Sequence, residues 1–310
     1  MDYSAIETAC RAGGSAFEYG GALAPLTSMK TGGKCDIVCE PSCEAALAEI
    51  VGACRKSGVP YFILGRGSNV LFRDNGYRGC VIRIAKGLGG ITASGDTITA
   101  GAGESLSAVC RAALEHGLGG MEFAYGIPGS VGGALYMNAG AYGGEMKDIV
   151  VSARCLTPGG DIMEIPAEKM QLRYRGSIFT GGEYIILSAK LRLHAADKSE
   201  IKSRMDELMQ RRRDKQPLEY PSCGSTFKRP EGYFAAALIE ECGLKGCTIG
   251  GAQVSEKHSG FVINRGGATS GDVMALVEHI RKTVLEQKGV ALECEMLIVP
   301  ENSGRTGGTG

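Results

Sequence analysis

The chain of 310 residues is 44% hydrophobic and 22% charged, and its 34 basic and 34 acidic residues cancel. This composition is typical of a globular protein with a large core, and the balanced charge excludes an overall attraction to nucleic acid or anionic membranes. The apolar runs are too short to span a membrane, and the amino terminus lacks the basic-then-apolar order of a secretory signal. We therefore expect a cytoplasmic protein that holds anionic ligands with local cations.

The twelve cysteines and four histidines show no spacing typical of a metal site. Cys35, Cys39 and Cys43 have neither C-x-x-C spacing nor the nearby histidine that zinc sites often use. Cys35 and Cys39 fall on one face of a predicted strand, where free cysteine behaves as a small hydrophobic residue. We predict reduced thiols and no bound metal.

The first predicted elements lead to a short loop of glycine and polar residues. In chain order we predict a strand, an amphipathic helix and a buried strand at 33–40, 44–56 and 61–64. The loop Gly65-Arg66-Gly67-Ser68-Asn69 follows directly. Such a loop can offer backbone N–H groups to an anion, and Arg66 adds a positive charge.

Two further strands, at 80–84 and 97–101, and a helix at 104–116 precede a stretch dominated by glycine. Ten of the 28 residues from Gly117 to Gly144 are glycine, and Pro128 lies near its middle. Successive tight turns of this kind can form a backbone nest for phosphate oxygens. The stretch contains neither the G-x-G-x-x-G of a dinucleotide fold nor a P-loop. An irregular structural loop remains the alternative.

The rest of the chain predicts an α+β protein, because short strands and helices do not alternate regularly. Strands are predicted at 149–157, 161–165 and 184–193, followed by a helix at 197–214. The run Arg211-Arg212-Arg213 in that helix is typical of a solvated face. From Pro221 the chain predicts a new α/β unit with helices at 233–242 and 271–287 and strands at 260–264 and 292–299. The last residues, 301–310, predict a disordered tail.

Three polar positions stand out against apolar or glycine-rich surroundings. They are Arg175 in RYRGSIF, Ser225 in PSCGSTFK and Glu295 in ALECEMLIV. If 292–299 is a strand, Glu293 and Glu295 share one face, so a carboxylate faces a site or a sheet edge. A surface salt bridge, a turn cap and an edge residue are the respective structural alternatives. No histidine stands in a comparable context, so no Ser/His/Asp triad is predicted.

Six ordered segments, from about Pro25 to Pro300, resemble the UDP-N-acetylenolpyruvoylglucosamine reductase (MurB) family. They are ILGRGSNVLFRDNGYRG, GMEFAYGIPGSVGGALYMNAGAYGGEM, YRGSIF, PSCGSTFKRP, CGLKGCTIGGAQVSEKHSGFVIN and LECEM. The resemblance implies an FAD-binding domain of the vanillyl-alcohol-oxidase (PCMH) type at 1–200, made of two α+β subdomains. It also implies a smaller C-terminal α/β substrate-binding domain at 201–300.

The resemblance further implies which residues hold FAD. The implied cofactor-binding residues are Gly65, Arg66, Gly67, Ser68, Asn69, Ile127, Pro128, Gly129, Ser130, Gly132, Gly133, Asn138, Gly140, Ala141 and Gly143. The first loop has no histidine or cysteine, to which relatives of this fold attach flavin covalently, so FAD is expected to be non-covalent. We also expect a monomer.

The reaction implied by the resemblance is the reduction of the enolpyruvyl group of UDP-N-acetylenolpyruvoylglucosamine to UDP-N-acetylmuramate, with NADPH as hydride donor. Arg175 and Glu295 match the family's residues that stabilise the charge developing on the substrate carboxylate. Ser225 matches the proton donor. Tyr174 and Lys215 match substrate-binding residues, Lys215 for the UDP diphosphate.

The sequence departs from the family pattern in two places. Many relatives read FKNP where this chain has Phe227-Lys228-Arg229-Pro230, so an asparagine contact with substrate does not carry over to Arg229. Between Leu193 and Pro217 there is no room for the tyrosine-bearing loop of one branch of the family. Two rival hypotheses stay open: another FAD-dependent oxidoreductase of the same fold, and a non-enzymatic nucleotide-binding module.

Overall fold

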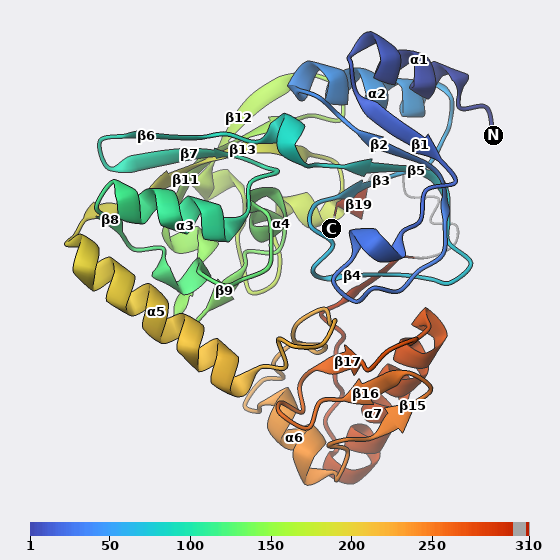
Figure 1. Ribbon diagram of the computed structural model, residues 1–310, viewed down its shortest axis with the longest axis vertical. Helices are drawn as coiled ribbons and strands as arrows, with labels where there is room; N and C mark the ends of the chain where they lie inside the picture. The colour runs from blue at the N-terminus through green and yellow to red at the C-terminus, as the bar shows by residue number, and fades with distance from the viewer. Residues whose placement is uncertain (300–307, 310) are drawn as a thin grey trace.

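The computed structural model describes residues 1–299 and 308–309, which form two five-stranded sheets with covering helices and a smaller C-terminal part (Figure 1). Seven α-helices occur in the described residues: α1 (Ser4–Ala12), α2 (Glu44–Lys56), α3 (Leu106–Glu115), α4 (Val131–Tyr136), α5 (Lys198–Lys215), α6 (Ala235–Glu241) and α7 (Ser270–Lys288). The mixture of parallel and antiparallel sheets with helices confirms the predicted α+β class.

The first sheet has the strand order β1 (Ala16–Tyr19), β2 (Cys35–Glu40), β5 (Tyr77–Arg83), β3 (Tyr61–Leu64) and β19 (Gly308–Thr309). Its central strands β2, β5 and β3 are parallel, and β3 is buried at all four positions. Helix α2 covers this sheet. Its hydrophobic residues recur at helical spacing and so form one face, on which Leu47, Ile50 and Cys54 are fully buried. Strand β3 therefore ends at one end of this sheet, and the glycine loop at 65–69 follows it there.

The second sheet is antiparallel throughout, with the order β12 (Ile162–Pro166), β11 (Val150–Leu156), β13 (Ile185–Arg192), β7 (Thr97–Gly101) and β6 (Ile91–Ser94). Helices α3 and α4 pack against it. Helix α4 lies inside the glycine-rich stretch, where no helix is predicted. Ser130 caps its start by accepting a hydrogen bond from the backbone N–H of Gly133.

The C-terminal part contains a three-stranded antiparallel sheet of β15 (Thr248–Ile249), β16 (Ala252–Val254) and β17 (Val262–Asn264) with helices α6 and α7. It has its own hydrophobic cluster, which includes Val273, Leu276 and Ile280 of α7. Helix α5 crosses between the two parts (Figure 1). Its buried Ile201 and Met205 belong to the larger cluster, whereas the second cluster combines residues after this helix with Met29 and Leu71.

Among the contacts that fix the C-terminal part against the rest, two involve regular secondary structure. Strand β18 (Leu297–Val299) pairs in parallel with β4 (Val70–Phe72). The Asp74 carboxylate accepts hydrogen bonds of 2.8 and 3.0 Å from the backbone N–H groups of Ser270 and Gly271, at the start of α7. The remaining strands are short pairs: β8 (Leu118–Gly119) with β14 (His194–Ala195), and β9 (Gly140–Ala141) with β10 (Gly144–Glu145).

Most of the predicted elements are confirmed, including the helix at 44–56 and the strand at 61–64. The predicted strand at 292–299 is wrong over its first half, because only Leu297–Val299 is a strand. The helix and strand of the first twenty residues were not predicted. Of the predicted disordered tail at 301–310, residues 301–307 and 310 lie outside the described residues, and 308–309 form β19.

All twelve cysteines are free of disulfide partners, and Cys35 and Cys39 are buried on β2, as predicted for small hydrophobic side chains. In the described part of the chain, no group of three or more His, Cys, Asp or Glu residues is placed to hold a metal ion. The helices of the described residues are all too short or too polar to cross a membrane.

Candidate functional site

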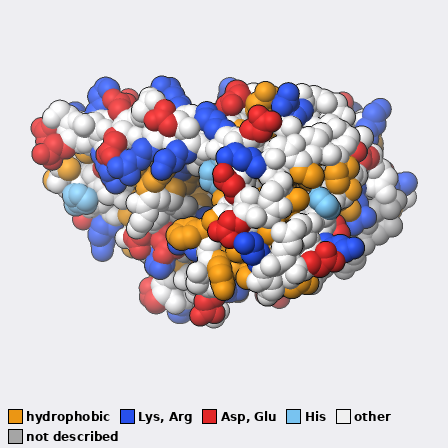
Figure 2. Space-filling view, turned by 90° about the horizontal axis from the view of Figure 1, so that it is seen from below, with side chains coloured by type: hydrophobic (Ala, Val, Ile, Leu, Met, Phe, Trp, Pro, Cys, Tyr) orange, Lys and Arg blue, Asp and Glu red, His pale blue; other side chains and the backbone are white. Residues whose placement is uncertain are grey.

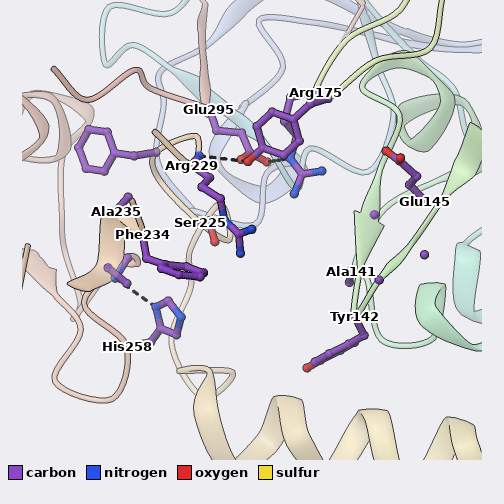
Figure 3. A pocket seen from close by; sticks show the side chains of 17 residues that line it. Ala141, Tyr142, Glu145, Arg175, Ser225, Arg229, Phe234, Ala235, His258 and Glu295 are labelled. Carbon is purple, nitrogen blue, oxygen red and sulfur yellow. Dashed lines mark hydrogen bonds and ion pairs between the residues drawn. The ribbon is translucent and has the colours of Figure 1, made fainter. Parts of the chain in front are cut away.

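A cavity of about 570 Å³ lies between the β9–β10 hairpin and the C-terminal part (Figure 3). Its lining comes from segments far apart in the sequence: Gly140, Ala141, Tyr142, Gly143, Gly144, Glu145, Tyr174, Arg175, Ser225, Phe227, Arg229, Phe234, Ala235, Ala236, His258, Gly260 and Glu295. The three predicted catalytic residues are therefore brought together at one cavity.

Arg175 and Glu295 form the most buried ion pair of this cavity. The Arg175 Nε donates to the Glu295 Oε1 at 2.6 Å, and the two side chains are 20% and 9% exposed. Arg175 sits in a tight turn closed by two backbone hydrogen bonds between Arg173 and Gly176, with a φ of +52°. This left-handed conformation is uncommon for a residue with a side chain, and such conformations cluster at functional sites.

Burial raises the pKa of the Glu295 carboxyl above its ordinary value, although the nearby positive charges of Arg175 and Lys228 act to lower it. Removing the carboxylate from water disfavours its charged form, and here that penalty exceeds the gain from the guanidinium. Glu295 is therefore closer to neutral than a free glutamate at the same pH. It can share or donate a proton to a neighbouring anionic group.

Ser225 reaches the same cavity because its segment pairs with the segment of Glu295. The Thr226 N–H donates to the carbonyl of Gly260, and the Glu295 N–H donates to the carbonyl of Thr226, each at 2.9 Å. Phe227 and Cys294 form an isolated antiparallel bridge. This pairing holds the serine hydroxyl and the carboxyl on neighbouring chain segments, and Ser225 is exposed toward the cavity.

The predicted substrate residues lie around the same cavity. Tyr174 lines it, and the Tyr174 hydroxyl accepts a 3.0 Å hydrogen bond from the Arg229 N–H. Lys215 is exposed at the end of α5 and does not line the cavity. Its charge nevertheless contributes to lowering the pKa of His258, a lining residue, behind the main effect of burial. Its link to the cavity is this minor effect on His258.

Sequence reasoning missed two side chains of the cavity, Phe234 and His258. Phe234 is 61% exposed, and the guanidinium carbon of Arg229 lies 4.3 Å from the centroid of its ring. His258 lines the same cavity as Ser225, which corrects the expectation that no histidine stands in a comparable context. Its Nδ1 accepts from the Gly260 N–H at 3.1 Å, which leaves Nε2 to carry the proton of a neutral ring. The KHSGF segment was the signal that could have located it.

The hairpin wall is fixed at its base by Asn138, which was predicted to bind the cofactor. Asn138 is fully buried, and its amide nitrogen donates to the Glu145 carboxylate at 2.7 Å and to the Arg173 carbonyl at 3.2 Å. Its oxygen accepts from the Lys147 N–H at 2.9 Å. These bonds join the hairpin to the turn that carries Arg175.

The two glycine-rich loops face each other across a second set of cavities. The largest, of about 750 Å³, is lined by Gly65, Arg66 and Pro128, and four basic side chains surround it: Lys30, Arg66, Arg83 and Lys86. Two smaller cavities, of about 30 and 60 Å³, are lined by Gly67, Ser68, Asn69, Ile127, Gly129, Ser130, Gly132 and Gly133. Every predicted cofactor residue except Asn138 lines one of these cavities or the catalytic one.

Two observations indicate that this space fits an extended dinucleotide cofactor. An added Cβ on Gly129 or Gly133 would meet no atom closer than 3.8 or 3.4 Å, so it would project into the free space between the loops. The buried Asn69 Oδ1 has no hydrogen-bond partner within the described chain, and a ligand N–H could satisfy it. The Asn69 amide nitrogen donates to the Glu295 carbonyl at 3.0 Å, which links this loop to the catalytic cavity.

Charges of both signs are mixed over the face of the molecule seen from below (Figure 2), in keeping with the net charge of zero. Anionic ligands must therefore be attracted by local groups. The basic side chains around the larger cavity, and Arg175 and Arg229 at the catalytic cavity, provide such groups.

Comparison with known proteins gives consistent matches along the chain. A family model described as UDP-N-acetylenolpyruvoylglucosamine reductase, C-terminal domain, matches residues 216–299, and one described as FAD binding domain matches residues 35–166. A UDP-N-acetylenolpyruvoylglucosamine reductase from Clostridium novyi (strain NT) is 50% identical over 277 residues, covering 89% of this chain and 90% of the relative. The enzyme of that name from Syntrophomonas wolfei is 48% identical over 275 residues, covering 89% and 92%.

A solved structure extends the match to three dimensions. The crystal structure of UDP-N-acetylenolpyruvylglucosamine reductase (MurB) from Thermus caldophilus superposes with a TM-score of 0.81 at 34% sequence identity. The alignment covers 92% of this chain and 100% of that one. The likeness therefore includes both the FAD-binding region (residues 35–166) and the C-terminal region (residues 216–299).

Proposed function

The chain belongs to the UDP-N-acetylenolpyruvoylglucosamine reductase family, and we propose that Arg175, Glu295 and Ser225 carry its chemistry. The protein reduces the enolpyruvyl group of UDP-N-acetylenolpyruvoylglucosamine to give UDP-N-acetylmuramate, in the synthesis of peptidoglycan precursors. It uses FAD, with NADPH as the reductant. The observation that carries the proposal is the convergence of these three side chains on one cavity.

The residues act on the charge that appears during reduction. When bound, FAD supplies to the terminal carbon of the alkene the hydride that it takes from NADPH. Negative charge then develops on the neighbouring carbon and spreads into the substrate carboxylate. Arg175 and a protonated Glu295 stabilise that charge with a cation and a hydrogen bond, which act strongly because both side chains are largely buried. Ser225 gives its hydroxyl proton to the neighbouring carbon, which completes the addition of hydride and proton.

The cofactor residues are proposed on the fit of the cavities between the two glycine-rich loops. Residues 65–69 and 127–133 would hold the FAD diphosphate, with Arg66 as a cation, and residues 140–143 would lie beside it. The first loop has no histidine or cysteine, which supports a non-covalent FAD. Asn138 would act indirectly, through the hairpin that it anchors.

Tyr174 and Lys215 are proposed substrate-binding residues, because one lines the catalytic cavity and the other interacts electrostatically with His258 beside it. We also propose that the chain belongs to the branch without the tyrosine-bearing loop, since α5 follows β14 directly. A monomeric, cytoplasmic protein with an FAD-binding domain at 1–200 and a substrate-binding domain at 201–300 remains the proposal for its organisation.

The proposal is tested by following the flavin absorbance in each half-reaction after rapid anaerobic mixing. Ser225→Ala should leave flavin reduction by NADPH nearly unchanged, because no substrate proton is transferred in that step. Reoxidation by UDP-N-acetylenolpyruvoylglucosamine should slow by roughly 10²–10⁴-fold, the usual contribution of a general acid. Ser225→Cys retains a proton donor and should recover part of the rate. Equal slowing of both half-reactions by Ser225→Ala would contradict the assigned role.

A further inference from the structure

Arg212 is a buried cation for which the reaction above has no use. It lies in the last turn of α5 and is only 6% exposed, although the neighbouring Arg211 and Arg213 are exposed. The prediction that the whole arginine run is solvated is therefore wrong for Arg212. Its position follows from the buried face of α5, because it lies four residues after Leu208.

The Arg212 guanidinium has few polar partners. One terminal nitrogen donates to the Gln216 side-chain oxygen at 3.3 Å, while the buried Nε has no hydrogen-bond partner among the described residues. No carboxylate of the described chain forms an ion pair with it, and burial lowers its pKa. Burying a guanidinium with so few polar partners costs free energy. Another contact or role of Arg212 must therefore offset that cost.

The principal contact of Arg212 is the ring of Tyr142, whose centroid lies 5.2 Å from the guanidinium carbon. This cation–π contact is strong when the cation is removed from water. The approach requires Gly126, since a Cβ there would lie 3.0 Å from the Arg212 Cδ and 2.9 Å from the Met209 Sδ. The helix is thus packed closely against the glycine-rich stretch at this point.

Tyr142 occupies a conformation that its residue type does not favour. It is the first of the two residues that join β9 to β10, and Tyr142 and Gly143 have φ values of +53° and +88°. Two positive φ values define a type I′ connection, which prefers asparagine and glycine. Tyr142 lines the catalytic cavity and extends toward the side that His258 occupies (Figure 3). A strained aromatic residue is thus held at the mouth of the site.

We propose that Arg212 is a positioning residue that fixes the Tyr142 ring over the catalytic cavity, where the ring packs on the bound nucleotide-sugar. The guanidinium carbon lies 5.2 Å from the ring centroid, and the turn at positive φ holds the ring at the cavity, so removal of either partner frees the mouth of the cavity. The inference rests on the proposed function, because it takes this cavity as the substrate site. It adds a substrate contact outside the group formed by Arg175, Ser225 and Glu295.

Tyr142→Asn is the decisive variant, because asparagine followed by Gly143 is the preferred sequence for this turn. The preferred turn sequence offsets the lost contact with Arg212, so the melting temperature should stay close to that of the wild type, and a loss of binding at that melting temperature cannot be assigned to misfolding. We expect KM for UDP-N-acetylenolpyruvoylglucosamine and the calorimetric Kd for UDP-N-acetylmuramate to rise by about tenfold, the equivalent of one good aromatic contact. The value of kcat should change much less. Tyr142→Phe keeps the ring and should retain wild-type KM.

Arg212→Met keeps the side-chain length without the charge, and should raise the same KM and Kd. Adding Arg212→Met to Tyr142→Asn should have little further effect, since Arg212 acts through Tyr142. Unchanged KM and Kd in Tyr142→Asn, or fully additive effects in the double variant, would overturn the inference. Failure of the proposed function is distinguishable, because it would appear in the wild-type protein as NADPH oxidation that does not depend on the enolpyruvyl substrate.

Discussion

The two walls of the catalytic cavity differ in what they are made of. The wall from the hairpin at 140–145 is largely backbone, with three glycines and one alanine among its six residues. The wall from the C-terminal region is largely side chain, and it contributes Ser225, Arg229, His258 and Glu295. The first wall sets the shape of the cavity, and the second sets its charges and protons.

This difference separates two kinds of sensitivity to substitution. On the backbone wall, and in the glycine loops behind it, added atoms matter because they compete with the main chain for space. On the side-chain wall, removal of one charged or acidic group matters because no neighbouring residue replaces it. The predictions below test this separation.

Among the tests of this separation, the largest effect is expected when Arg175, which completes the side-chain wall, loses its charge. Arg175→Met should slow flavin reoxidation by substrate by roughly 10²–10³-fold, the usual cost of removing one preorganised stabilising group. Arg173→Met is the matched control, because Arg173 lies in the same turn but is exposed and does not line the cavity. Rapid-mixing absorbance measures both. Similar slowing in the two variants would show that the turn, and not the Arg175 charge, is responsible.

The next effect concerns the glycine loop that we assign to FAD. Gly67 has a φ of +63°, and a Cβ there would lie 2.3 Å from the Leu26 carbonyl oxygen. Gly67→Ala should therefore shift the main chain, weaken FAD binding and lower the melting temperature. Gly58→Ala is the control, because Gly58 has a φ of +62° with no atom within 4 Å of the added Cβ.

Both glycine variants carry the conformational cost of alanine at positive φ, about 1 kcal/mol, so their difference isolates the collision with the main chain. FAD content after gel filtration and thermal unfolding report the two consequences. Equal loss in both variants would mean that backbone conformation, and not contact with Leu26, determines the loop.

The sequence predicts the backbone wall from composition alone, because ten glycines in 28 residues leave few side chains to cover the main chain. It does not predict helix α4, since valine, glycine and alanine at 131–134 form a helix only after Ser130 caps it and the second sheet packs against it. It also does not reveal that Asn138 anchors the hairpin, because its partners Glu145 and Arg173 are set by tertiary contacts.

The side-chain wall is predicted less completely from local pattern. Strand periodicity places Glu293 and Glu295 on one face, yet Glu293 is exposed beside Lys228, and Glu295 is buried beside Arg175. The pairing of this segment with residues 226–228 determines the outcome, and that pairing is not local. Arg212 is the reverse case, because the spacing of Met205, Leu208 and Arg212 already indicates one buried face of α5.

A smaller effect concerns the balance of burial and charge at Glu295. The folded-state pKa of Glu295 is raised above its ordinary value of 4.5, so the native protein binds more protons than the unfolded chain from pH 4.5 up to that raised pKa. The free energy of unfolding therefore falls as the pH rises through this window. Arg175→Met removes a cation that lowers this pKa. The fall in the free energy of unfolding should therefore extend to higher pH.

Urea unfolding at a series of pH values measures this dependence. Glu295→Gln cannot titrate, so its free energy of unfolding should not fall in this way. Arg192→Met is the control for Arg175→Met, because the pair of Arg192 with Asp96 is long and exposed. A pH dependence in Glu295→Gln equal to that of the wild type would assign the effect to another group.

The smallest predicted effect concerns the contact of Asp74 with the start of α7, which helps to hold the two walls in place relative to each other. Asp74, from the FAD-binding region, caps α7 of the C-terminal region by accepting from Ser270 and Gly271. Asp74→Ala should lower the free energy of unfolding by about 1 kcal/mol, the usual cost of a lost helix cap. Asp96→Ala, which removes an exposed surface pair, should change it far less.

Asp74→Ala also tests whether the walls act as one unit, because the cap lies away from the catalytic cavity. If the remaining contacts, such as the pairing of β18 with β4 and the hydrogen bond from Asn69 to Glu295, are enough to hold the regions together, the variant should lose stability in urea and keep wild-type rates in both half-reactions. Slower reoxidation by substrate, with flavin reduction unchanged, would show that the cap also positions Ser225 and Glu295 against the hairpin. In that case the backbone wall and the side-chain wall would not act separately, since their position relative to each other would itself contribute to the reaction.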